Sequence, residues 1–148
     1  YGMVGERPEE GDLYDLTAYG ISNEYRKGIK NCIQAIINSS KIPSKVPKGT
    51  RKLLPARCSM SDILRAVQLK HSLIYSLMTS DIGMELFRKE SDILVDVLLT
   101  LKGKGIVALP IHDAVIVKEE DKQETIIVMK DVFKKHTGLT PNVTLDKL

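Results

Sequence analysis

Apolar residues recur at steps of three and four residues along much of the chain, which predicts amphipathic helices. The widest apolar stripe runs from Met84 to about Lys102 and indicates a helix that is buried. Polar residues that can cap a helix precede the other apolar patterns. The predicted helices run from Asp12 to near Gly20, from Ser22 or Asn23 through Ile37, from Ser61 or Asp62 to Met78, from Met84 to Lys102, and from Glu119 to Gly138.

Two apolar runs rich in β-branched residues break this helical pattern in the C-terminal part of the chain. Residues 106–111 and 114–118 predict the arms of an antiparallel hairpin, with His112 and Asp113 at its tip. A carboxylate there can be solvated or held by a metal, and it can also be an ordinary turn former. Residues 142–145 are predicted as a closing strand. The pattern as a whole predicts an α+β fold.

Length and composition bound the class of protein. The chain has 148 residues, which is enough for a single domain with a core of its own. No segment approaches the roughly 18 apolar residues of a membrane span. Cys32 and Cys58 have no spacing that favours a disulfide framework or a zinc site, which suits a reducing compartment and predicts the cytoplasm. Because the first residue is Tyr1 rather than Met, we expect that a preceding segment is missing.

Positive charge is concentrated in one stretch, although the net charge of +3 is too small to indicate a nucleic-acid partner by itself. The stretch from Lys41 to Arg57 holds no acid and is broken by prolines and a glycine, so an extended basic loop is predicted. Its candidate nucleic-acid-binding residues are Lys45, Lys48, Arg51 and Lys52. A basic loop of this kind can follow a phosphate backbone, and a solvated surface loop explains it equally well.

The order of these elements resembles a known enzyme superfamily. Arg26 and Lys30 are four residues apart, which puts them on one side of a helix and roughly 6 Å apart along its axis. Asp12-Leu13-Tyr14 precedes them, and a hairpin with His112-Asp113-Ala114 follows a long apolar helix. This arrangement resembles the fingers and distal palm of family A DNA polymerases and single-subunit RNA polymerases.

The resemblance implies both an architecture and a set of roles. Residues from about 11 to 80 would be fingers-like, and those from about 81 to 148 would be palm-like, within one domain. Asp113, beside His112, would be a catalytic ligand of Mg²⁺, and Arg26 and Lys30 would bind a nucleoside triphosphate. The residues that would complete the nucleotide site are Gln34 and Asn38, where the superfamily carries aromatic residues. The partners implied are a DNA primer-template and a nucleoside triphosphate.

One part of the superfamily's site is not found in this chain. Two-metal phosphoryl transfer needs carboxylates on both sides of the metal pair. The superfamily's other catalytic aspartate lies upstream of the helix that carries the Arg and Lys, on a strand that this chain does not hold. We therefore expect the C-terminal portion of a polymerase that lacks an N-terminal segment and is inactive alone. The alternative is a non-catalytic α+β module that binds nucleic acid or another partner.

Overall fold

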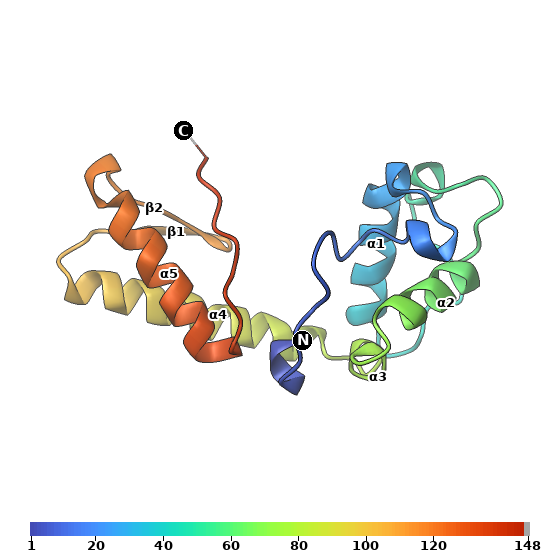
Figure 1. Ribbon diagram of the computed structural model, residues 1–148, viewed down its shortest axis with the longest axis horizontal. Helices are drawn as coiled ribbons and strands as arrows, with labels where there is room; N and C mark the ends of the chain where they lie inside the picture. Colours follow the sequence, from blue (N-terminus) through green and yellow to red (C-terminus); the bar gives the residue numbers. More distant parts are fainter. Residues whose placement is uncertain (147–148) are drawn as a thin grey trace. The chain divides into compact units, whose positions relative to one another are not determined.

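The computed structural model, which describes residues 1–146, is an α+β fold of helices and one antiparallel hairpin (Figure 1). The chain forms two compact units. The helical unit comprises residues 8–85, and the hairpin unit comprises residues 1–7 together with the chain from Leu86 onward. The prediction of one polymerase-like domain with parts at about 11–80 and 81–148 stays a prediction.

The helical unit is built on three α-helices. They are α1 (Arg26–Ile37), α2 (Met60–Lys70) and α3 (Tyr75–Met78). Their apolar faces meet in one core, because the buried residues recur at helical spacing. The buried core includes Leu16, Ile29, Cys32, Ile36, Ile63, Val67 and Met78. The polar side of α1 is thereby left at the surface.

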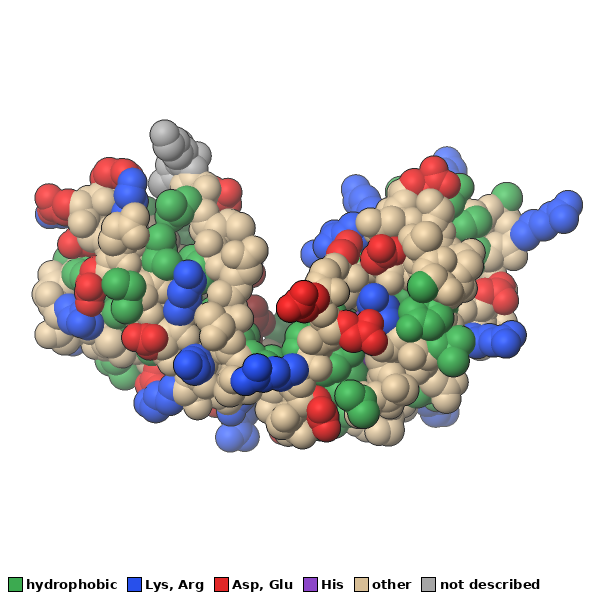
Figure 2. Space-filling view, viewed as in Figure 1, with side chains coloured by type: hydrophobic (Ala, Val, Ile, Leu, Met, Phe, Trp, Pro, Cys, Tyr) green, Lys and Arg blue, Asp and Glu red, His purple; other side chains and the backbone are tan. Residues whose placement is uncertain are grey.

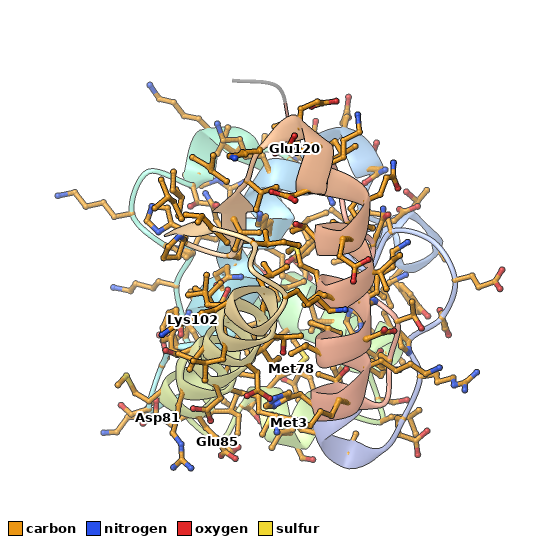
Figure 3. The ribbon with its side chains drawn as sticks, turned by 90° about the vertical axis from the view of Figure 1, so that its left-hand side faces the viewer. Met3, Met78, Asp81, Glu85, Lys102 and Glu120 are labelled. Atoms are coloured by element: carbon orange, nitrogen blue, oxygen red, sulfur yellow. The ribbon has the colours of Figure 1, made fainter. Side chains whose placement is uncertain are left out.

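The hairpin unit combines two long helices with a short hairpin. Its elements are α4 (Gly83–Gly103), which begins three residues before the unit, β1 (Leu109–Ile111), β2 (Ala114–Ile116) and α5 (Lys122–Thr137). Val97 and Leu101 of α4 pack against Val128 and Val132 of α5, and Val115 of the hairpin packs on this cluster. Figure 3 labels Lys102 near the end of α4 and Glu120 just before α5. The hairpin predicted after the long apolar helix therefore packs against that helix and α5.

The ends of α1 and α5 agree closely with the sequence. Ser22 accepts a hydrogen bond from the backbone of Glu24 and begins a 3₁₀ turn that leads directly into α1. A 3₁₀ turn at Glu119–Asp121 similarly precedes α5. The helix ends at Gly138, whose φ of 72° lies in the left-handed region that glycine adopts readily.

The prediction for α2 was wrong at both ends. Ser59, rather than Ser61 or Asp62, is the N-cap, and Asp62 completes a capping box with it. The helix ends at Lys70 instead of continuing to Met78. Its C-cap is His71, whose ring nitrogen Nε2 lies 3.0 Å from the carbonyl oxygen of Leu13. This contact comes from a distant part of the chain, so helical periodicity could not reveal it.

The α-helix predicted after Asp12 does not form. The Asp12 carboxylate instead accepts a hydrogen bond from the backbone N–H of Tyr14, and Asp15 accepts one from Thr17. Such local bonds offer the backbone an alternative to helix. What remains is a 3₁₀ turn at Thr17–Tyr19 that ends, as expected, at Gly20.

The hairpin has the predicted centre but shorter arms. Leu109 pairs with Ile116, and Ile111 pairs with Ala114, while the flanking residues 106–108 and 117–118 are not strand. All three residues of β1 are exposed. Only one face of the hairpin packs on the helices, so the other keeps its apolar side chains at the surface.

Two further expectations were wrong. The long helix α4 is only partly buried, because Phe87, Val95 and Leu99 remain exposed on it. Hydrophobic side chains do reach the visible surface in Figure 2. The closing strand predicted at residues 142–145 is absent, since this stretch forms no regular structure. Leu145 is 61% exposed, and β propensity is realised mainly where a strand is half buried. Among residues 1–146, no helix is both long and apolar enough to cross a bilayer.

Candidate nucleotide-binding site

The residues proposed to bind the nucleotide lie on the exposed side of α1 and at its C-cap. They are Arg26, Lys30, Gln34 and Asn38, and all four are exposed. They recur every four residues, and the opposite side of the helix carries the buried residues of the core. Gly28, which lies between Arg26 and Lys30 in the sequence, is on the buried side of the helix. The structure thus places Arg26, Lys30 and Gln34 along one side of α1 and Asn38 at its C-cap.

Tyr14 lies against both cations. The centre of its ring is 5.0 Å from the guanidinium carbon of Arg26 and 5.9 Å from Nζ of Lys30. A cation at this distance from an aromatic face is attracted by the ring's quadrupole. Tyr14 is also packed against the core of the helical unit. The ring is therefore a fixed support on which both positive groups rest.

Arg26 is also paired with Asp12. Its Nε lies 2.5 Å from Oδ2 of Asp12, and its Nη2 lies 3.1 Å from Oδ1. The hydrogen bond from Arg26 is the main reason why the pKa of Asp12 lies below its usual value. The same bond raises the pKa of Arg26. One of the two cations is thus locally neutralised.

The side chain of Asn38 contacts both the backbone and the side chain of Gln34. Nδ2 of Asn38 donates to the backbone oxygen of Gln34 at 2.9 Å and lies 3.4 Å from its Oε1. Asn38 also lies against Gly83, where an added Cβ would come within 2.3 Å of the Asn38 Oδ1. These amides can accept and donate hydrogen bonds, but they offer no ring on which a base could stack.

The basic loop is held against α1 at one end. A Cβ added at Gly28 would lie 2.2 Å from the backbone oxygen of Leu53, so α1 and this part of the loop are in direct contact. Asn31 of α1 also donates to the hydroxyl of Thr50 at 3.3 Å. The segment from Thr50 to Leu53 is therefore fixed to the helix that carries the nucleotide candidates.

The basic residues of the loop fall into two groups. Arg51 donates to the backbone oxygens of Pro55 and Cys58, so its guanidinium braces the loop. Lys45, Lys48 and Lys52 are exposed, and none has an ion-pair partner among residues 1–146. Charged side chains of both signs are interspersed on the face shown in Figure 2. The exposed lysines are thus the loop's groups best placed to meet phosphate.

His112 and Asp113 form the two-residue turn between β1 and β2, and both are exposed. The φ of His112 is 53°, in the left-handed region, and Asp113 has negative φ. The position of the carboxylate at the tip was therefore predicted from the sequence. Its metal role stays a prediction, and residues 1–146 contain no group of three or more His, Cys, Asp or Glu residues that could hold a metal ion.

A single exposed carboxylate does not fit the Mg²⁺ of the expected reaction, since Mg²⁺ keeps most of its waters unless several anions hold it. Further ligands for a metal ion bound at Asp113 would have to come from outside the part of the chain that the structure describes. Asp113 belongs to the hairpin unit, whereas Arg26 and Lys30 belong to the helical unit. The roles that the resemblance implies for Asp113, Arg26 and Lys30 in one nucleotide site stay predictions.

The sequence did not reveal two contacts at this site. The first is the Asp12–Arg26 pair, whose members are 14 residues apart. An aspartate forms an Asx turn as readily as it caps a helix, and neither role indicates a pairing with Arg26. The second is the close approach of the loop at Gly28. Its signal was a glycine inside a predicted helix, which often marks a packing contact.

Comparison of the chain with protein family models, curated proteins and solved structures finds no match.

Proposed function

We propose that the chain is the C-terminal portion of a template-dependent nucleotidyltransferase, similar to a family A DNA polymerase, which adds nucleotides to a primer. One observation carries the proposal: Arg26 and Lys30 lie over the same Tyr14 ring on the exposed side of α1. Two cations fixed on one rigid surface suit an oligophosphate, whose negative charges are close together. The helical unit would then hold the triphosphate of the incoming nucleotide.

Positioning and charge stabilisation supply nearly all of phosphoryl-transfer catalysis. Lys30, which lies over the Tyr14 ring and has no acid partner among residues 1–146, needs little reorganisation when the phosphates arrive, whereas Arg26 must share its donors with Asp12. In this proposal Arg26 and Lys30 bind and orient the triphosphate, and the exposed Lys45, Lys48 and Lys52 contact the phosphates of the primer-template. Asp113 would be one acid of a larger site that other parts of the enzyme complete. We expect such an enzyme in the cytoplasm, where free cysteines persist.

The test is binding of a nucleoside triphosphate to the 148-residue chain, measured by calorimetry. Arg26→Ala and Lys30→Ala should each weaken binding about tenfold, the equivalent of losing one charged hydrogen bond. Lys27→Ala is the matched control, because Lys27 is exposed on the same helix turn. If all three variants bind equally, the two cations over Tyr14 are not the triphosphate site and the proposal fails.

A second candidate is a non-catalytic nucleic-acid-binding module. It is favoured by the basic loop, whose fixed end lies on α1, and by the single carboxylate at the hairpin tip. Such a module would bind DNA with an affinity that falls steeply with salt, and Lys48→Ala and Lys52→Ala would each reduce the salt slope by about one. Lys130→Ala on α5 is the control. DNA binding without triphosphate binding would favour the module.

A further inference from the structure

Asp12 occupies one of the edges of Arg26 that an oxyanion could use. A guanidinium has five N–H donors arranged as a fork, and two adjacent donors commonly grip two oxygens of a carboxylate or phosphate. Here Nε and Nη2 of Arg26 are both engaged by the Asp12 carboxylate. The bidentate position formed by Nε and Nη2 is therefore already filled by a group of this chain.

The carboxylate is held in place independently of Arg26. Its Oδ1 accepts a hydrogen bond of 3.0 Å from the backbone N–H of Tyr14, and the Tyr14 side chain packs against the core. Asp12 therefore cannot turn away without losing this bond. The Tyr14 ring lies against the guanidinium as well, so Arg26 is fixed by two groups from one short segment.

The pair changes the charge that an incoming phosphate meets. Asp12 and Arg26 together are neutral, which leaves Lys30 as the cation over the ring without an acid partner among residues 1–146. We propose that Asp12 is a built-in counter-anion, which competes with the phosphates of a nucleotide for Arg26 and keeps the affinity of the site low. This inference rests on the proposed function, because it concerns the same triphosphate site.

The test is the binding of inorganic triphosphate to the 148-residue chain and to its Asp12→Asn variant. Asparagine removes the negative charge but can still accept the backbone hydrogen bond of Tyr14. Affinity should rise about fivefold, since a charge about 4 Å from a bound anion at an exposed site is worth roughly that factor. Asp12→Ser, which also supports the turn, should show the same direction.

Asp15→Asn is the matched control. It removes the same charge three residues away, and Asp15 hydrogen-bonds to Thr17 rather than to Arg26. Its affinity should remain within about twofold of the wild type, because solvent and salt screen a charge that makes no direct contact. A second comparison uses the Arg26→Ala background. If Asp12 acts by competing for Arg26, Asp12→Asn should have little effect once the guanidinium is gone.

The outcomes separate this inference from the proposed function. If wild type binds triphosphate through Arg26 and Lys30 but Asp12→Asn binds equally or more weakly, Asp12 is not a competitor and only this inference is overturned. If neither protein binds triphosphate, both proposals fail. Binding by Asp12→Asn alone would support the counter-anion directly. Circular dichroism spectra that match the wild type will show that each variant is folded.

Discussion

The carboxylate of Asp96 on α4 lies 2.8 Å from Nε2 of His136 in the last turn of α5. Nζ of Lys135 approaches the same oxygen of Asp96 at 3.1 Å. These contacts link the two long helices of the hairpin unit. The hydrogen bond from His136, followed by that from Lys135, holds the pKa of Asp96 below its usual value. Its ionised form is thus favoured by folding.

Asp96 should make the stability of the protein depend on pH. A carboxyl group with a lowered pKa in the folded state stabilises the fold above its unfolded pKa of about 3.9, and this contribution is lost as pH falls through the folded value. We expect Asp96→Asn to lower the free energy of unfolding near pH 6 and to have little effect near pH 2. Urea denaturation across this range measures the difference. Asp131→Asn, at an exposed position of α5, is the control, and an equal pH profile for both variants would contradict the prediction.

Gly28→Ala should destabilise the helical unit. The new Cβ would lie 2.2 Å from the backbone oxygen of Leu53 and 2.8 Å from Cδ2 of Leu54, so the backbone of α1 or of the loop must move. Overpacking of this kind costs about 2–3 kcal/mol. The measurement is the free energy of unfolding in urea. Gly103→Ala is the matched control, because nothing lies within 4 Å of a Cβ there. That control should leave stability unchanged or raise it by up to about 1 kcal/mol, as alanine favours helix.

The backbone conformation of the hairpin turn predicts how substitutions at position 112 rank in their free energy of unfolding. The φ of 53° at His112 strains any residue with a Cβ, and β-branched residues suffer most. His112→Val should lower the free energy of unfolding by about 1–2 kcal/mol. His112→Gly should be neutral or slightly stabilising, because relief of strain outweighs or balances the added freedom of the unfolded chain. Thermal and urea unfolding will rank the variants, and a valine variant as stable as wild type would show that the turn is not strained.

The chain alone should not extend a primer. Asp113 is a single exposed carboxylate, and residues 1–146 hold no cluster of metal ligands. Without further anions a pair of metal ions is neither fixed nor neutralised. A primer-extension assay with purified protein, template and Mg²⁺ tests this. Template-dependent extension that Asp113→Asn abolishes would mean that the chain supplies a second ligand after all.

The sequence predicted those elements whose signals are local. Ser22 begins the turn into α1, Gly138 ends α5, and the apolar runs around His112 and Asp113 mark the hairpin. Each depends on residues within a few positions of one another. The α+β class followed from these elements, as did the exposed row that begins with Arg26 and Lys30.

The remaining features depend on contacts between distant residues. The end of α2 is tied to the bond between His71 and Leu13, which are 58 residues apart. Burial of α4 was overestimated. An apolar stripe shows which side of a helix can pack, but the short hairpin covers only part of the stripe on α4. The role of Arg51 as a brace depends on the path of the loop, which its charges did not reveal. Tertiary packing decided each of these points.

Pro110 at the centre of β1 makes the two edges of the hairpin unequal. With a two-residue turn, Ile111 and Ala114 form the hydrogen-bonded pair, so the backbone groups of Pro110 and Val115 point away from the partner strand. Proline has no N–H, and the outer edge of β1 therefore lacks a donor in the middle of the strand. The outer edge of β2 keeps the N–H and carbonyl of Val115. A strand added to this sheet would consequently lie beside β2, and self-association through β1 is opposed by the sequence itself.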